Sequence, residues 1–373
     1  MRIGFDAKRA FSNKTGLGNY SRDSIRLLSH FYADNKYFLY TPDKKLNISF
    51  PYLDNSKNIY LRTPSSLINK VLKSYWRSKS IVRDLFTNKI DVYHGLTNEL
   101  PFGIEKINIK TVVTIHDLIF IRYPHLFKNI DRKIYYKKFR SACERADKII
   151  AVSEQTKKDI IDFFKIQESK IIVVYQGCNK VFQSSISIKQ KKEIIKKYQI
   201  PNHYLLYVGS IEKRKNLLTI LKTLKELPNQ RLVVIGEGKS YKVECLRFIT
   251  KNNLSNRVIF LSELSLQEMA AIYQSAQIMI YPSIFEGFGI PILESLFSKT
   301  PVITSKGGCF SESGGKGSKY INPLSVNEMK NAIQEIQNST KIQNTMIKKG
   351  IEHSQKFTDE KISINLMSVY NRL

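Results

Sequence analysis

The sequence predicts an α/β protein made of two doubly wound, Rossmann-like domains. Short runs of β-branched and aliphatic residues alternate with amphipathic segments of ten or more residues, which is typical of βαβ units and parallel sheets. The chain has 373 residues, enough for two ordinary domains, and 42% of them are hydrophobic. Because two such series of strands follow one another, we expect two domains with their ligand in the cleft between them.

Most predicted strands are bounded by Gly, Asp, Asn or Ser. They cover residues 2–6, 37–41, 91–94, 111–115, 148–152 and 171–175 in the first series, and 204–209, 231–236, 257–261, 277–281 and 301–304 in the second. We expect an N-terminal domain over 1–182, a C-terminal domain over 183–355 and a last helix, 356–373, that packs back on the N-terminal domain. The polar stretch 183–197 is predicted to be the hinge.

The sequence lacks the signals of export and of metal binding. It has no apolar run long enough to span a membrane, and we expect no secretory leader, because the first residues are predicted to form a strand. Its four cysteines form no C-x-x-C pair, its six histidines show no ligand spacing, and no D-x-D triplet occurs. We therefore expect a cytoplasmic protein with reduced thiols, no metal site and no cofactor.

The net charge of +28 is extreme. An anionic membrane surface, a phosphorylated substrate or a nucleic acid would each explain it, and so would a genomic bias toward lysine, since the chain is rich in Ile, Lys and Asn throughout. Composition leaves these alternatives open.

Candidate ligand-binding residues are those that follow the strands, because open parallel sheets bind ligands beyond their carboxyl ends. After the first strand, Gly16 and Gly18 stand at the mouth of a helix, where glycines let the backbone approach a phosphate. The motif alone is a weak signal, because the third glycine of the dinucleotide fingerprint is absent. No acidic residue ends a second strand about twenty residues later, which argues against a dehydrogenase. A simple tight turn is the alternative interpretation.

His116 directly follows the strand predicted over 111–115. At the carboxyl end of a central strand, its ring could hydrogen-bond a sugar hydroxyl or a developing charge. The alternative is a structural histidine bonded to a neighbouring loop.

Arg214 and Lys215 follow the first strand of the second series, at the start of a predicted helix. The helix dipole opposes cations at this position, so a bound diphosphate is expected to supply the missing counter-charge. A solvated basic turn is the alternative.

The most informative segment is 281–294, which follows a strand and opens a helix with Pro291 in its first turn. Gly287 and Gly289 are expected to expose backbone N–H groups to an anion or a hydroxyl. Glu286 lies before them and Glu294 eight residues later. This arrangement suits a polyhydroxylated ligand that carries a diphosphate.

Taken together, these residues resemble the retaining glycosyltransferases of family 4, with their two-domain GT-B fold. Glu286 and Glu294 are similar to the family's E-x7-E signature, and segment 209–216 to its basic phosphate-binding loop. Gly16–Gly18 and segment 116–118 fall where the family has its N-terminal glycine loop and cleft histidine. Other similar stretches are 151–154, 174–177 and 299–303.

The resemblance implies transfer of a hexose from a nucleotide diphosphate sugar to an acceptor hydroxyl, with retention of configuration and without a metal. GDP-mannose is the first candidate donor, with UDP-glucose and UDP-N-acetylhexosamines as alternatives. The acceptor would be a glycan or a lipid-linked glycan in polysaccharide biosynthesis. One departure is Ser210, where many members carry Arg, so diphosphate binding would depend more on the next basic residues of the loop.

The resemblance also implies roles for single residues. Glu294 would hold the donor ribose, Glu286 would lie near the donor sugar, and His116 would contact that sugar near the reacting carbon. Arg214 and Lys215 would neutralise the leaving diphosphate. The other implied contacts with the donor are Gly16, Gly18, Gly287, Phe288, Gly289 and Ile290.

Two other classes of protein compete with this interpretation. Within enzymes, another GT-B activity is possible, such as a sugar-nucleotide epimerase or a phosphorylase. Outside enzymes, a basic nucleic-acid-binding protein would explain the charge. We expect no nucleic-acid partner, because no aromatic-basic recognition motif is evident on a predicted sheet.

Two N-terminal segments suggest attachment to the inner face of a membrane. Segment 65–86 places apolar residues at helical spacing with five basic residues and one acidic residue between them. Segment 122–145 has eight basic and two acidic residues with interleaved aromatics. Basic amphipathic helices of this kind lie in the headgroup plane of anionic membranes. The alternative is that the apolar positions are ordinary core faces.

Overall fold

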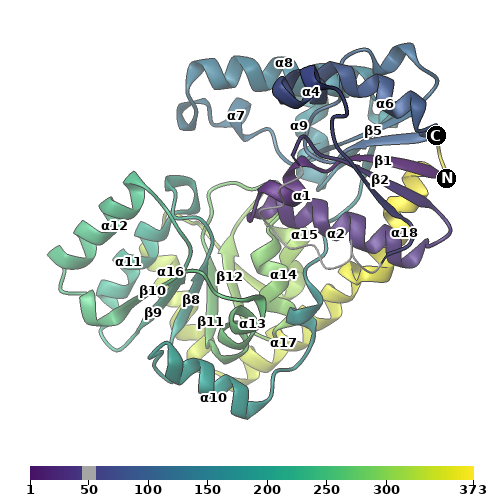
Figure 1. The fold of residues 1–373 in the computed structure, drawn as a ribbon. Helices are drawn as coiled ribbons and strands as arrows, with labels where there is room; N and C mark the ends of the chain where they lie inside the picture. The colour runs from purple at the N-terminus through teal and green to yellow at the C-terminus, as the bar shows by residue number, and fades with distance from the viewer. Residues whose placement is uncertain (44–55) are drawn as a thin grey trace. The chain divides into compact units, whose positions relative to one another are not determined.

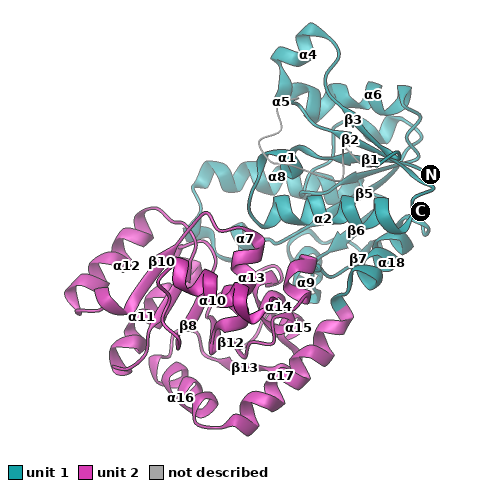
Figure 2. Cartoon of the chain, turned by 60° about the horizontal axis from the view of Figure 1, so that its bottom comes forward, with its two compact units in different colours: residues 1–177, 357–373 teal, residues 178–356 magenta. Residues whose placement is uncertain are grey.

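The computed structural model describes residues 1–43 and 56–373, which form two compact units. Unit 1 comprises residues 1–177 and 357–373, and unit 2 comprises residues 178–356 (Figure 2). The sequence predicts these divisions after residues 182 and 355. The last helix, α18 (Asp359–Tyr370), belongs to unit 1 and packs on α2 (Gly16–Phe31).

Unit 1 is a parallel sheet flanked by helices (Figure 1). In the described residues its strands have the order β3-β2-β1-β4-β5-β6-β7. The strands are β1 (Arg2–Asp6), β2 (Lys36–Tyr40), β3 (Ile59–Arg62), β4 (Val92–Gly95), β5 (Lys110–Ile115), β6 (Lys148–Ala151) and β7 (Ile171–Val173). The further helices are α1 (Lys8–Ser12), α4 (Leu67–Val71), α5 (Lys73–Tyr75), α6 (Ile81–Thr87), α7 (Ile119–Arg122), α8 (Asn129–Arg145) and α9 (Glu154–Phe164).

The sheet of unit 1 buries both of its faces. Along β5, Val112 belongs to the core that α2 and α18 cover, whereas Val113 and Ile115 belong to the core that includes residues of α6, α8 and α9. Alternate side chains of a strand point to opposite faces, so a run of β-branched residues suits a strand that is covered on both sides.

Unit 2 has the same architecture, with the strand order β10-β9-β8-β11-β12-β13 in a parallel sheet. The strands are β8 (Leu205–Val208), β9 (Leu232–Ile235), β10 (Val258–Leu261), β11 (Ile278–Tyr281), β12 (Val302–Ser305) and β13 (Ser318–Ile321). The helices are α10 (Ile188–Lys197), α11 (Leu217–Glu226), α12 (Ser240–Lys251), α13 (Leu266–Ser275), α14 (Ile290–Phe297), α15 (Phe310–Gly314), α16 (Val326–Gln337) and α17 (Thr340–Ser354).

Both sheets reverse their strand order at one point, between β1 and β4 in unit 1 and between β8 and β11 in unit 2. In doubly wound sheets, the crevice beyond the carboxyl ends of the strands at such a switch point is the usual ligand site. In unit 2, the loops that leave this point are residues 209–216, after β8, and residues 282–289, after β11. We call them the basic loop and the acidic loop.

The structure corrects the predicted hinge. Residues 188–197 form helix α10, whose first turn is capped because the Ser187 side chain accepts a hydrogen bond from the Gln190 backbone N–H. The helix packs on α13, and at its end Lys197 forms an ion pair of 2.6 Å with Glu268. The stretch is polar because one side of a surface helix faces water. It belongs to unit 2, and the chain passes between the units at residues 177–178 and 356–357.

Candidate active site

The basic and acidic loops of unit 2 are joined by hydrogen bonds. The backbone N–H of Ile284 donates to the carbonyl of Arg214 at 2.8 Å. The Asn216 side chain donates to the carbonyls of Pro282, at 3.3 Å, and Pro323, at 2.6 Å. Asn216 has a φ of 58°, a left-handed conformation that asparagine tolerates better than most residues. These bonds fix the side chains that both loops carry.

A three-residue charge cluster lies where the two loops meet. Oε1 of Glu286 is 2.6 Å from a guanidinium nitrogen of Arg214 and 2.6 Å from the ammonium of Lys215. Lys215 also donates to the Tyr281 hydroxyl at 2.6 Å, and Arg214 donates to the carbonyl of Phe285 at 2.6 Å. Two cations and one carboxylate leave the cluster with a formal charge of +1.

The electrostatics of this cluster follow from burial and proximity. Burial alone would raise the pKa of Glu286, but Lys215 and Arg214 outweigh it and lower that pKa to about 2. Burial lowers the pKa of Lys215, and the attraction of Glu286 partly offsets the loss. The carboxylate is therefore ionised at neutral pH.

The cluster changes the interpretation of Arg214 and Lys215. Their position in the sequence predicts that a bound diphosphate supplies the counter-charge. The structure shows that Glu286 of the same chain supplies it. The pair of cations precedes α11, in a 3-10 turn over Lys213–Lys215.

The acidic loop ends at helix α14 with a conformation that requires glycine. Gly289 has a φ of 121° and is the N-cap of α14, without a side-chain capping hydrogen bond. The thiol of Cys309 donates to the carbonyls of Phe288, at 2.8 Å, and Glu286, at 3.2 Å. Gly287 and Phe288 are buried in the loop, and Ile290 is the first residue of the helix.

Glu294 lies on the first turns of α14 and is half-buried. The hydroxyl of Tyr273, on α13, donates to its Oε2 at 2.8 Å. Burial raises the pKa of Glu294 to about 7, although the bond from Tyr273 works in the opposite direction. This carboxyl group thus changes charge near neutral pH, unlike Glu286.

In unit 1, Gly16 and Gly18 lie in the first turn of α2, as the sequence predicts. A Cβ atom at Gly18 would lie 1.8 Å from the backbone oxygen of Asn13, whereas one at Gly16 would have open space. Gly18 is therefore required for a close backbone contact within the loop.

His116 is buried in unit 1, and both of its ring nitrogens have partners within the protein. Nε2 lies 2.9 Å from the carbonyl of Leu96, and Nδ1 lies 3.1 Å from the side-chain amide of Gln176. Because a carbonyl only accepts, Nε2 carries the proton and Nδ1 accepts from Gln176. Burial lowers the pKa of His116 to about 4. The structure shows a neutral histidine bonded to a neighbouring loop, and its role toward a sugar stays a prediction.

The structure thus gathers Arg214, Lys215 and Glu286 into direct contact, and it places Gly287–Ile290 and Glu294 on the loop and helix that follow. Gly16, Gly18 and His116 lie in the other unit. Sequence reasoning missed Tyr273, because nothing in helix α13 marks it as the partner of a carboxylate 21 residues later. Within residues 1–43 and 56–373, no group of three or more His, Cys, Asp or Glu residues could hold a metal ion.

Two family models match the chain, one to each unit. The model described as Glycosyltransferase Family 4 matches residues 36–180, and the model described as Glycosyl transferases group 1 matches residues 190–353. The second match contains the basic loop, the acidic loop and Glu294.

Curated relatives include two bacterial mannosyltransferases. The chain is 30% identical over 227 residues to the O-antigen chain mannosyltransferase RfbU of Salmonella typhimurium, and the match spans 60% of each protein. It is 23% identical to the O-antigen chain mannosyltransferase B of Escherichia coli, over 76% of this chain and 74% of that relative.

Among solved structures, the sucrose-phosphate synthase of Thermosynechococcus elongatus matches all of this chain and 98% of its own, with a TM-score of 0.81 and 18% identity. HepE of Anabaena, in complex with UDP-glucose, matches over the full length of both chains with a TM-score of 0.78 and 17% identity. These likenesses show that the two parallel-sheet units form a GT-B fold. No helix in the described part of the chain combines the length and apolar character that a membrane crossing requires.

Proposed function

Because the chain belongs to the family 4 glycosyltransferases, we propose that it transfers a hexose from a nucleotide diphosphate sugar to a hydroxyl group of a glycan or lipid-linked acceptor, with retention of configuration. The observation that carries the proposal is the cluster of Arg214, Lys215 and Glu286 at the switch point of unit 2, followed by Glu294 on α14. Cations for a diphosphate and carboxylates for hydroxyls lie together at the usual ligand site of such a sheet.

Breaking the bond between a sugar and a diphosphate concentrates negative charge on the leaving oxygens and positive charge on the sugar ring. Arg214 and Lys215 are held in place before the reaction, by Phe285 and Tyr281 respectively, so they can stabilise the leaving diphosphate without reorganising. The buried position strengthens this interaction relative to water. The cations thereby supply the charge stabilisation that a divalent ion gives in other enzymes, which supports a metal-independent reaction.

The two glutamates have different environments and so different tasks. Glu286, ionised and bound to both cations, holds them where we propose that the diphosphate binds. Glu294 is fixed through Oε2 by Tyr273, and a carboxylate has further lone pairs for the two ribose hydroxyls. Retention needs no protein nucleophile if the leaving phosphate oxygen accepts the acceptor's proton on the same face of the sugar.

Mannose is the first candidate for the transferred sugar, with GDP-mannose as the donor. Two relatives bear the name O-antigen chain mannosyltransferase, and one of them shares 30% identity over 60% of its length. UDP-glucose, which is bound in the structure of HepE, is the main alternative. The two relatives named as O-antigen chain mannosyltransferases also support a polysaccharide as the product.

The proposal is tested first by a thermal-shift screen of GDP, UDP and their sugars on the purified protein. A ligand that binds only the folded state must raise the melting temperature. The stabilising sugar nucleotide is then incubated with a glycan acceptor in the presence of a chelator. Transfer with retained anomeric configuration supports the proposal, whereas epimerised donor, phosphorolysis or strict dependence on a divalent metal would contradict it. A gel shift on nucleic acid tests the competing class.

We also propose that unit 1 attaches to an anionic membrane surface. The predicted helix over 65–86 is divided in the structure: Trp76, Ile81 and Leu85 are core residues. In contrast, the residues of α4 face water, with Leu67 and Val71 each 80% exposed. Lys70 lies between them on this short helix. Exposed aliphatic side chains beside a lysine, in a protein of net charge +28, suit an anionic lipid surface better than water.

A further inference from the structure

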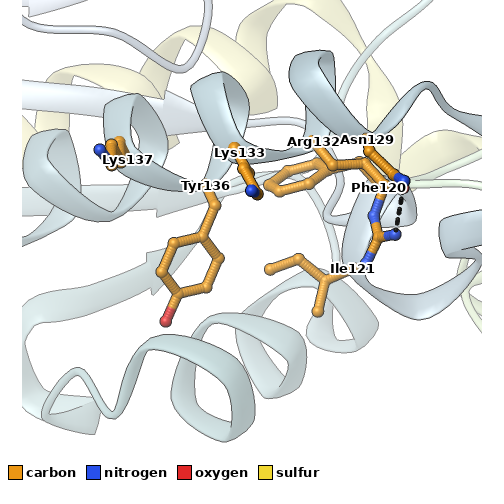
Figure 3. A pocket seen from close by; sticks show the side chains of 7 residues that line it. All are labelled: Phe120, Ile121, Asn129, Arg132, Lys133, Tyr136 and Lys137. Atoms are coloured by element: carbon orange, nitrogen blue, oxygen red, sulfur yellow. Dashed lines mark hydrogen bonds between the residues drawn. The ribbon is translucent and has the colours of Figure 1, made fainter.

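Unit 1 contains a pocket that the proposed donor site does not use (Figure 3). It lies between α7 and the first half of α8, and its volume is about 440 Å³. Helix α7 begins three residues after His116, at the carboxyl end of β5. The pocket thus lies near the carboxyl end of β5, and doubly wound domains bind their ligands beyond the carboxyl ends of their strands.

One side of the pocket is apolar and aromatic. It consists of Phe120, Ile121 and Tyr136, whose side chains border the same hollow in Figure 3. The ring of Phe120 packs edge-on against Phe139 at a centroid distance of 5.2 Å, and Tyr136 packs edge-on against Phe164 at 5.5 Å. These contacts fix the rings, so this wall is preformed.

Basic side chains of α8 also line the pocket. Arg132, Lys133 and Lys137 line it, and none of the lining residues is acidic. Arg132 donates to the side-chain oxygen of Asn129 at 3.3 Å, as the dashed line in Figure 3 shows. Its Nε atom is buried and has no hydrogen-bond partner in the described part of the chain. A buried donor of this kind costs free energy unless a ligand satisfies it.

The position of these cations on α8 also favours an anionic ligand. Arg132 lies in the first turn of this 17-residue helix, where the helix dipole opposes positive charge, and Lys133 follows it directly. A phosphate group would satisfy the Arg132 guanidinium and balance the charge of Lys133. Inorganic phosphate alone would leave the wall of Phe120, Ile121 and Tyr136 in contact with water.

From this combination we infer that the α7–α8 pocket binds a phosphate group joined to an apolar chain, with the phosphate on Arg132 and Lys133 and the chain along Phe120, Ile121 and Tyr136. That such a molecule is the acceptor, a lipid phosphate that carries the growing glycan, rests on the proposed function. The binding site itself does not, because no residue of unit 2 contributes to it.

The test is calorimetric binding of three probes to the full chain: farnesyl phosphate below its micelle concentration, farnesol and inorganic phosphate. Farnesyl phosphate is expected to bind at least about tenfold more tightly than either of the others, since it alone carries both a phosphate group and an apolar chain. Arg132→Gln should weaken its binding about tenfold or more, which corresponds to the loss of a hydrogen bond to a charged group. Lys110→Gln, an exposed lysine at the opposite end of β5, should leave it within about twofold.

A second variant and a second ligand complete the test. Lys133→Gln changes only an exposed side chain and should weaken the binding of farnesyl phosphate to a similar degree, so a folding defect of the arginine variant cannot mimic the result. Equal binding of farnesol, or unchanged binding by both variants, overturns the inference. GDP-mannose binding, measured on the same samples, separates the two proposals. If wild type binds farnesyl phosphate but not GDP-mannose, the proposed donor site is contradicted. If it binds GDP-mannose but not farnesyl phosphate, the proposed pocket is contradicted.

Discussion

The carboxylate of Glu286 lies 2.6 Å from the ammonium of Lys215, and both side chains are largely shielded from water. Lys215 comes from the basic loop, after β8, and Glu286 from the acidic loop, after β11. These two strands flank the switch point of unit 2. Burial lowers the pKa of Lys215, and the attraction of Glu286 offsets part of this effect without a ligand. A diphosphate can therefore enter a site whose cations are already positioned.

Lys215→Ala should weaken the binding of the donor nucleotide sugar by about 30- to 1000-fold while the protein stays folded, since the loss of a charged contact in a preorganised site costs about 2–4 kcal/mol. Isothermal titration of GDP-mannose measures the effect. Lys213→Ala is the matched control: Lys213 is exposed in the same 3-10 turn. Equal binding by wild type and Lys215→Ala would remove the lysine from the donor site.

Glu286→Gln should destabilise the protein at neutral pH by about 3 kcal/mol, because it leaves Arg214 and Lys215 without a counter-charge. The folded pKa of Glu286, about 2, is below its usual value of 4.5. Its contribution to stability is therefore complete above pH 4.5 and is lost as the pH falls toward 2. Between pH 4.5 and 2, the free energy of unfolding should therefore fall more steeply for wild type than for the variant. Urea unfolding of both proteins across this range measures the difference.

A bound anion should restore the stability that Glu286→Gln removes. GDP is expected to raise the melting temperature of the variant more than that of wild type, because it replaces the missing counter-charge. A variant as stable as wild type at pH 7, or one that GDP does not stabilise, would show that the carboxylate is not what holds the two cations.

Donor binding should strengthen as the pH rises through the pKa of Glu294, about 7. A carboxylate accepts from both ribose hydroxyls, whereas the protonated form offers less acceptor capacity. Below the pKa, affinity should fall by up to about tenfold per pH unit. GDP-mannose is the ligand to titrate, since both of its phosphates are esterified and do not change charge near pH 7. Glu294→Gln should bind more weakly than wild type at pH 8, and its affinity should vary little with pH.

The central strands were predictable from sequence, but two edge strands were not. Strands such as β5 and β9 are runs of aliphatic and β-branched residues buried on both faces, which only a central parallel strand explains. Strand β3 is half-buried along its whole length, and β13 begins with Ser318 and Lys319. At an edge, polar side chains meet water, so the hydrophobic pattern that marks a strand is weaker.

The parts of the candidate site were predictable one loop at a time, but their contacts were not. Glycines and charged residues after strands indicated where Arg214, Lys215 and Glu286 would lie. Their mutual pairing depends on two loops about 70 residues apart in the sequence meeting at the switch point. The partners of His116 likewise come from separate loops, through Leu96 and Gln176, and no local pattern announces such contacts.

His116→Ala should lower the rate of transfer more than it lowers nucleotide affinity, because its predicted partner is the donor sugar. The change should also cost about 1–3 kcal/mol of stability, since the Leu96 carbonyl and the Gln176 amide lose their buried partner. With a pKa of about 4, the ring stays neutral between pH 5 and 8 and should add no step to the pH profile of wild type in that range. Single-turnover rates and GDP titrations separate the two effects. A normal rate with weakened GDP binding would reverse the predicted role.

Attachment to membranes should depend on the exposed aliphatic residues of α4. In a flotation assay, the protein should rise with vesicles of phosphatidylcholine that contain roughly one third phosphatidylglycerol, and it should stay behind with phosphatidylcholine alone. Raising the salt from about 50 mM to about 500 mM should weaken the attachment, because ions screen the attraction between lysines and headgroups. Leu67→Gln with Val71→Gln should weaken it at both salt concentrations, since about 1.5–3 kcal/mol is lost for each apolar side chain that no longer enters the lipid.

The folded state should tolerate this double substitution, because both side chains are 80% exposed and leave the core unchanged. Leu324→Gln is the matched control: Leu324 is 64% exposed but lies in unit 2, so its loss should not affect flotation. If wild type fails to float with anionic vesicles at low salt, α4 is not a lipid-binding element. If the double variant floats as well as wild type, the positive charge alone accounts for the attachment, and the apolar face of α4 has no part in it.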